Sequence, residues 1–173
     1  MSTEGGYFGG NIVYLRIPCL QQLNSLEVLG CGLVQVIESK APNLSNLRFV
    51  GDLHVCLLLG RTPPLKKLSV TYDEAAFYAR TEFPSSMPNL EALSICSRVE
   101  VMPVCQGVSI FVDPLDLRTV PEHHHDKLRH VEIINFSSAK SLIELTCHIL
   151  QSIRLLERLT LDTTEASAML SFR

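Results

Sequence analysis

The stretch "PNLSNLRFV", which spans Pro42–Val50, places apolar side chains at Leu44, Leu47 and Phe49 directly after a Pro-Asn pair. The same apolar-x-x-apolar-x-apolar spacing occurs six times along the chain. The six copies are Leu23/Leu26/Val28, Leu44/Leu47/Phe49, Leu65/Leu68/Val70, Leu90/Leu93/Ile95, Leu128/Val131/Ile133 and Leu156/Leu159/Leu161. Their first residues lie 21, 21, 25, 38 and 28 positions apart, which indicates a repeated unit with one enlarged interval.

The spacing within each copy is that of a short β-strand with one buried face. Side chains alternate across a strand, so the second and third apolar residues of a copy point the same way. Parallel strands that stack side by side join these faces into one core. Repeats of roughly 20–29 residues with this pattern are typical of leucine-rich repeats. We therefore predict an α/β fold, a leucine-rich-repeat solenoid with a parallel sheet of about six strands and helical or irregular convex segments. The alternative is an ordinary α/β domain whose strands happen to share a register.

The segments between the strands are predicted from turn residues and from helical spacing. Proline-containing turns precede three of the strands, at Pro42-Asn43, Pro63-Pro64 and Pro88-Asn89. We expect the segments Val34–Ser39 and Asp73–Arg80 each to form a short helical turn. The clearest helix should follow a Ser138 cap, because apolar residues recur there at helical spacing. These residues are Leu142, Leu145, Ile149 and Ile153.

The chain is expected to divide into a flexible N-terminal tail (1–11), a leucine-rich-repeat domain (12–164) and a C-terminal tail (165–173). The interval 99–127 within the repeat domain is predicted to be enlarged or irregular, with a strand-like excursion over Pro103–Pro121. A stable solenoid needs terminal repeats with a polar outer face. The apolar alternation of Ile12, Val13, Leu15 and Ile17 therefore predicts an exposed or poorly capped end of the stack.

Composition and charge argue against several classes of partner. The 173 residues are 46% hydrophobic and 19% charged, which suits one sizeable core. A net charge of −3 without long runs of like charge gives no electrostatic basis for binding nucleic acid or an anionic membrane. The apolar run Val55–Leu59 is far shorter than the ~20 residues of a membrane span. We expect neither a nucleic-acid partner nor a membrane segment.

The cysteines and the first residues of the chain favour a reducing compartment. Six cysteines are scattered singly without a CxxC pair, so buried free thiols are favoured over disulfides. The first fifteen residues contain neither Lys nor Arg and show no secretory signal pattern. We expect a cytoplasmic or nuclear location.

Two groups of residues could suggest chemistry, and both are better explained without it. The run His123–Asp126 has neighbouring side chains on opposite faces and no Cys or Glu at ligand spacing, so a solvated loop is favoured over a metal site. Cys147 and His148 are adjacent and diverge by about 100° on a helix, so they cannot act as nucleophile and base. No phosphate-binding, nucleophile-elbow or metalloprotease motif occurs. The sequence predicts no enzyme, no cofactor and no metal.

The remaining candidate for function is the outward face of the predicted sheet. One outward row is Ser25, Asn46, Lys67, Ala92, His130 and Arg158, and the next is Glu27, Arg48, Ser69, Ser94, Glu132 and Thr160. Mixed charges and small polar residues suit a protein or peptide partner better than a phosphate backbone. The residues proposed to bind that partner are Glu27, Arg48, Lys67, His130, Glu132 and Arg158. Alternatively, cross-strand charges such as Glu27 and Arg48 only keep the sheet soluble.

Three segments of the chain resemble plant F-box/leucine-rich-repeat proteins with FBD-like C-terminal regions. They are "QVIESKAPNLSNLRFVGDL" (Gln35–Leu53), "AAFYARTEFPSSMPNLEALSICSR" (Ala75–Arg98) and "HDKLRHVEIINFSSAKSLIELTCHILQSIRLLERLTLDTT" (His125–Thr164). In that family an F-box engages a Skp1-type adaptor, and the repeats are taken to present a substrate to a cullin-based ubiquitin ligase. The resemblance therefore implies a module resembling the substrate-recognition region of an SCF-type ubiquitin ligase.

The chain departs from this family plan in two places. No F-box-like helical segment precedes the first repeat, so we do not expect this chain alone to bind a Skp1-type adaptor. The stretch Val101–Gly107 looks shortened relative to the family, as if a repeat were missing. The alternative function is therefore a truncated or spliced repeat fragment that acts as a non-ligase scaffold or has no selected function.

Overall fold

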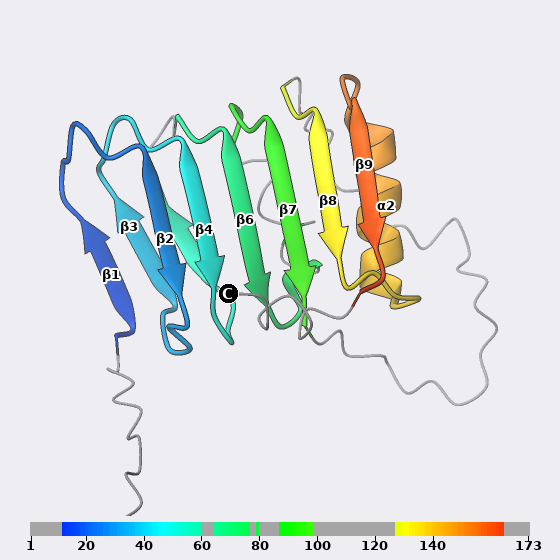
Figure 1. The fold of residues 1–173 in the computed structure, drawn as a ribbon, viewed down its shortest axis with the longest axis horizontal. Coiled ribbons are helices and arrows are strands. Elements are labelled where there is room, and N and C mark those ends of the chain that lie inside the picture. The colour runs from blue at the N-terminus through cyan, green and yellow to red at the C-terminus, as the bar shows by residue number, and fades with distance from the viewer. Residues whose placement is uncertain (1–11, 60–63, 77–78, 80–86, 99–126, 165–173) are drawn as a thin grey trace, which may run out of the picture.

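A computed structural model describes residues 12–59, 64–76, 79, 87–98 and 127–164 of the chain (Figure 1). Its main feature is a six-stranded parallel sheet with the strand order β2-β4-β6-β7-β8-β9. The strands are β2 (Ser25–Leu29), β4 (Asn46–Val50), β6 (Lys67–Tyr72), β7 (Ala92–Ser97), β8 (His130–Ile134) and β9 (Arg158–Asp162). Each strand coincides with one of the six apolar triplets, so the predicted solenoid with about six parallel strands is confirmed.

The register of the large sheet aligns the repeats residue for residue. Leu47 pairs with Leu26 on one side and Leu68 on the other, and Phe49 pairs with Val28 and Val70 in the same way. These side chains point to one face and are buried or half-buried, while the residues between them are more exposed. The alternating burial is the direct result of the period-two apolar pattern in the sequence.

A second parallel sheet lies behind the first repeats (Figure 1). Its order is β1-β3-β5, formed by Tyr14–Ile17, Val36–Ser39 and Cys56–Leu58. The predicted helical turn at Val34–Ser39 is therefore wrong. The β-branched residues of this segment favour extended backbone. Ile37, which is 0% exposed, faces the core between the two sheets and is paired with Leu15 and Leu57 of the neighbouring strands.

Helical structure replaces this second sheet in the later repeats. Ala75, Ala76 and Ala79 are helical and buried, as predicted, although residues 77, 78 and 80 of that segment lie outside the described residues. The predicted helix after the fifth triplet is α2 (Lys140–Ser152), which lies behind the C-terminal end of the large sheet (Figure 1). Its core-facing residues are Leu142, Leu145 and Ile149.

The predicted cap of α2 is wrong. The N-cap residue is Ala139, which makes no side-chain capping bond, and Ser138 is exposed. The Ser137 hydroxyl instead accepts a bond from the Ala139 backbone N–H at 3.4 Å. The buried side chain of Ala139 ties the start of the helix to the core, so burial rather than capping positions this end.

Asparagine side chains connect neighbouring repeats. Asn43 of the turn before β4 donates to the carbonyl of Gln21, at 2.6 Å. Asn135 has a left-handed backbone (φ 60°), which asparagine tolerates, and donates to the Ser97 carbonyl at 2.7 Å. The first bond satisfies a carbonyl group where the chain approaches the sheet and the second satisfies one where it leaves, so both fix one repeat against the next.

Several predicted features lie outside the described residues. They are the tails 1–11 and 165–173, the excursion Pro103–Pro121, the run His123–Asp126 and all of the interval 99–127 except Lys127. The division of the chain into these segments stays a prediction.

Candidate functional site

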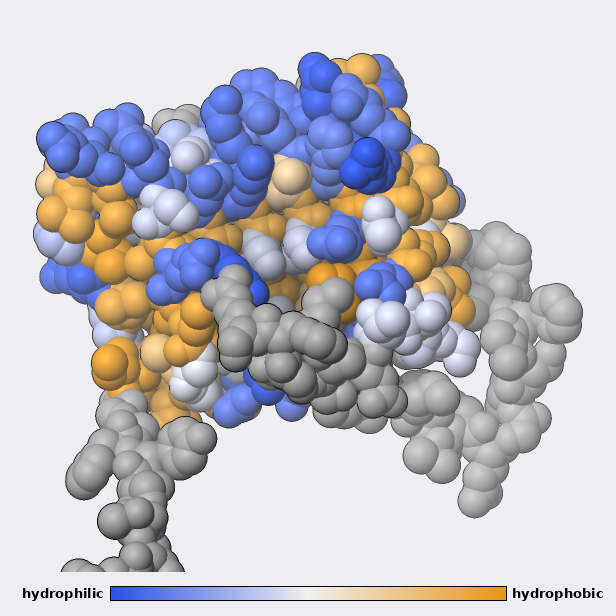
Figure 2. All heavy atoms as spheres, viewed as in Figure 1, coloured by the Kyte–Doolittle hydropathy of each residue, from blue (hydrophilic) through white to orange (hydrophobic). Residues whose placement is uncertain are grey.

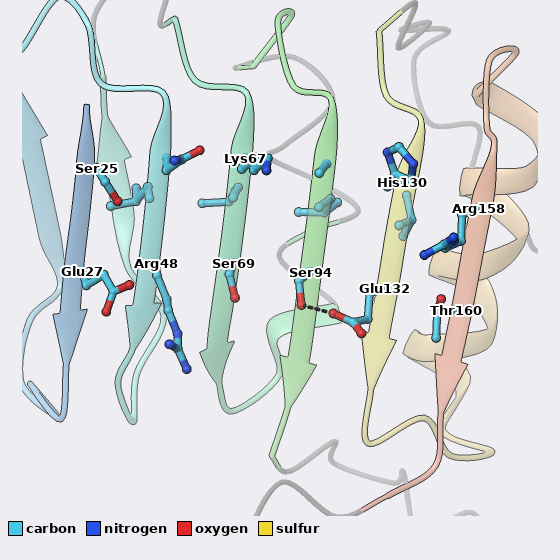
Figure 3. A pocket seen from close by; sticks show the side chains of 16 residues that line it. Ser25, Glu27, Arg48, Lys67, Ser69, Ser94, His130, Glu132, Arg158 and Thr160 are labelled. Atoms are coloured by element: carbon cyan, nitrogen blue, oxygen red, sulfur yellow. Dashed lines mark hydrogen bonds between the residues drawn. The ribbon is translucent and has the colours of Figure 1, made fainter. Parts of the chain in front are cut away.

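The outward face of the large sheet carries the two rows of side chains predicted from the sequence (Figure 3). The strand register places Lys67 between Asn46 and Ala92, and Ala92 next to His130. The complete rows are Ser25, Asn46, Lys67, Ala92, His130 and Arg158, and Glu27, Arg48, Ser69, Ser94, Glu132 and Thr160. This placement follows from β-strand alternation once the apolar residues face the core.

A groove of about 460 Å³ runs along these rows. Small side chains at its centre, from Ser69, Ala92 and Ser94, leave the backbone close to the surface. Longer side chains surround them, and all six residues predicted to bind a partner line the groove (Figure 3). They are Glu27, Arg48, Lys67, His130, Glu132 and Arg158. Arg48 is half-buried and the other five are exposed.

The charges in the groove are largely unpaired. No ion pair is formed by Arg48, Lys67 or Arg158 with any carboxylate of the described residues, and their side chains are not engaged by hydrogen bonds there. Glu132 accepts a hydrogen bond from the Ser94 hydroxyl at 3.0 Å. Glu27 is the register partner of Arg48, yet the two form no salt bridge. The alternative role of these charges, keeping the sheet soluble, needs no ion pair and stays an alternative interpretation.

A second band of charges follows the edge where the strands begin. Figure 2 shows hydrophilic side chains along this upper edge of the exposed face. Arg129 lies 2.6 Å from Glu157, and the same carboxylate is 3.7 Å from His130 Nε2. Lys66 is paired with Glu91 at 3.2 Å. Sequence reasoning missed this rim because it considered only the residues between the apolar positions. The residues that it missed each lie directly before a strand, and they are Lys66, Glu91, Arg129 and Glu157.

The opposite rim is a third outward row that is mainly apolar. The register aligns Leu29, Val50, Thr71, Cys96, Ile134 and Asp162. Cys96 is 4% exposed, and burial raises the pKa of its thiol. Arg98 reaches from the end of β7 to Asp52, at 3.0 Å, and donates to the carbonyl of Gly51. The sequence held a signal for this row, since period-two alternation places one more outward residue directly after the last apolar residue of each triplet.

No group of three or more potential metal ligands occurs among the described residues. Cys147 and His148 are both half-buried on α2, on the far side of the sheet from the groove. Within the same residues, none of the helices is long and apolar enough to cross a membrane.

The parallel register, the apolar triplets and the open outward face define a leucine-rich-repeat domain. The family model described as the At1g61320/AtMIF1 leucine-rich-repeat domain matches residues 9–107 and 103–172. The chain therefore belongs to this plant F-box/leucine-rich-repeat family, whose repeat domain is a non-catalytic module, and no F-box domain is found in it. No curated protein and no solved structure matches the chain.

Proposed function

We propose that this chain is a protein-interaction module that holds a segment of a protein partner along the groove of its large sheet. The observation that carries the proposal is that all six candidate residues line one groove, and that the side chains at the centre of this groove are small. Leucine-rich-repeat domains generally bind proteins, and repeat architectures use their extended surfaces for this purpose. From the family of the chain, we propose that the partner is a substrate that the repeat domain presents to an SCF-type ubiquitin ligase.

The physical basis is a surface with small side chains at its centre and with charges that have no ion-pair partner among the described residues. Ser69, Ala92 and Ser94 allow a partner backbone to approach the sheet closely. Arg48 and Lys67 gain opposite charges on binding without first losing an ion pair, so a matching partner displaces only water from them. Reversing such charges should lower the association rate as well as the affinity.

A peptide-display selection on the purified chain tests this proposal. An unbiased library is panned against the native chain, and the selected peptides are measured against the double variant Lys67→Glu/Arg158→Glu. We expect the variant to bind about tenfold or more weakly, because like charges then face the partner. Arg154→Glu is the matched control, since Arg154 is exposed and lies outside the groove. Selected peptides that bind all three proteins equally would refute the proposal.

The ligase connection has its own test. We propose that the repeats supply substrate recognition only, so this chain alone is not expected to bind a Skp1-type adaptor. Mixing the purified chain with a recombinant adaptor and measuring complex formation by size-exclusion chromatography should show two separate peaks. A stable complex would mean that the repeat region itself holds the adaptor. We also propose a cytoplasmic or nuclear location, which the five free cysteines among the described residues support.

A second candidate function is a non-ligase scaffold produced by truncation or splicing, or a fragment without selected function. It is favoured by the two family matches, which overlap over residues 103–107, inside the stretch Val101–Gly107 that looks shortened. Comparison of genomic and transcript sequences across these codons tests it. Continuous genomic sequence with no alternative junction there would remove its support.

A further inference from the structure

We infer that the groove recognises an extended acidic segment in which two carboxylates stand four residues apart. This inference rests on the proposed function and specifies the ligand of the same groove. One carboxylate meets Lys67 on β6, and the other meets Arg158 on β9. The proposed segment lies across the strands, along the row from Lys67 through His130 to Arg158 that is labelled in Figure 3.

The spacing follows from the geometry of the sheet. Lys67 and Arg158 belong to the same outward row, with Ala92 and His130 between them. Their strands are three steps apart, which at about 4.8 Å per step places their backbones ~14 Å apart. An extended peptide advances about 3.3 Å per residue, so four residues cover ~13 Å. An even spacing also keeps both carboxylates on the same side of the peptide.

The charges and shapes of the groove favour this orientation. The lysine and the arginine have no carboxylate partner among the described residues, and Ala92 between them leaves room for the peptide backbone. On the neighbouring row, Glu132 is held by Ser94, and its charge disfavours a further acid on that side of the ligand. The side chains that alternate with the acid pair should therefore be neutral or basic.

A nucleic acid would also present anions, but the groove fits it less well. Glu27 and Glu132 both line the groove, where they would repel a continuous phosphate backbone. Two carboxylates at fixed positions avoid these glutamates, whereas evenly spaced phosphates do not. The geometry therefore favours a peptide, and single-stranded RNA becomes a comparison ligand in the test.

The test uses labelled ten-residue peptides of Gly, Ser and Thr that carry two glutamates, measured by fluorescence anisotropy with the full chain. The peptide with glutamates at positions i and i+4 should bind about tenfold more tightly than peptides with i and i+3 spacing or with two glutamines. Lys67→Glu and Arg158→Glu should each remove this preference, and Arg154→Glu should keep it. A peptide with two lysines at i and i+4 should bind Lys67→Glu/Arg158→Glu better than it binds the native chain.

The outcomes separate this inference from the proposed function. Equal binding of the glutamate and glutamine peptides would overturn the inference. Display-selected peptides that depend on Lys67 and Arg158 but contain no acid pair would also overturn it, while leaving the proposed function intact. Single-stranded RNA that binds more tightly than the i, i+4 peptide and depends on the same two residues would replace the peptide as ligand. Circular dichroism of each variant, expected to match the native chain, verifies that the exposed substitutions leave the fold unchanged.

Discussion

Phe49 lies in the core with its ring 6.2 Å from that of Tyr72, in an edge-on arrangement. The ring also occupies the space where a side chain on Gly51 would begin. Gly51→Ala should therefore lower the free energy of unfolding by about 1–3 kcal/mol through overpacking. Chemical denaturation followed by circular dichroism measures this loss.

Gly32→Ala is the matched control for that substitution. The added methyl group meets only the side chain of Asp52, which is 68% exposed and can turn away, giving up no more than an exposed ion pair with Arg98 that contributes little. Its effect should stay within about 0.5 kcal/mol. Equal losses for the two variants would show that the Phe49 ring does not restrict Gly51.

Glu38 should make the fold sensitive to acid. The hydrogen bond from the Tyr14 hydroxyl, together with Arg16 and Lys40 nearby, holds the pKa of Glu38 below its ordinary value of 4.5. On acidification, the unfolded chain therefore binds a proton at Glu38 before the folded chain does. The stabilisation that ionised Glu38 gives to the fold is complete above pH 4.5, and it is lost as the pH falls through the lower pKa of the folded state. Glu38→Gln should lower stability at neutral pH and flatten the decline below pH 5. Unchanged acid sensitivity in unfolding midpoints from about pH 7 to 3 would contradict this assignment.

At the scale of single elements, α2 is held by one face. Leu145 is 2% exposed and faces the core, whereas Leu150 on the same helix is 58% exposed. Leu145→Ala should cost about 2–5 kcal/mol, because it removes buried methyl groups and leaves a cavity. Leu150→Ala should change the free energy of unfolding by less than about 0.5 kcal/mol. Urea unfolding of both variants measures the difference, and similar midpoints would mean that the helix does not pack as described.

The elements differ in how far the sequence predicts them. The large sheet was predictable because each strand repeats the same triplet, so one register satisfies all six. The strand Val36–Ser39 was not, since a run as short as this has no periodicity that separates a strand from a helical turn. The pairing of this segment with β1 makes it a strand and not a helical turn. The start of α2 was missed because the apolar contact of Ala139 outweighs the capping preference of Ser138.

At the scale of the whole molecule, the β1 end of the stack exposes apolar side chains. Ile12, Val13 and Tyr14 are 50%, 47% and 50% exposed. Such a surface next to β1, whose outer edge pairs with no other described strand, favours association. Sedimentation velocity should show self-association that rises with concentration and that decreases in Val13→Lys. A native chain that stays monomeric at all concentrations would contradict the role of this end.

The site was predictable in position but not in electrostatic state. Strand alternation was enough to place Lys67, Glu132 and the other four candidates on one face. Which charges are paired depends on side-chain geometry across strands. Glu132 bonds to Ser94, and the register neighbours Glu27 and Arg48 do not form an ion pair, although their spacing in the sequence suggests one.

Photo-crosslinking from defined positions tests the central claim, that partners bind on the outward face of the large sheet. A photoreactive residue replaces Ser69 or Ser94 in the groove, or Leu58 on the second sheet, which is 48% exposed. Each protein is irradiated with a display-selected ligand, and the cross-linked product is quantified by mass spectrometry. We predict strong cross-linking from Ser69 and Ser94 and only background from Leu58. Cross-linking from Leu58 with none from the groove would contradict the account.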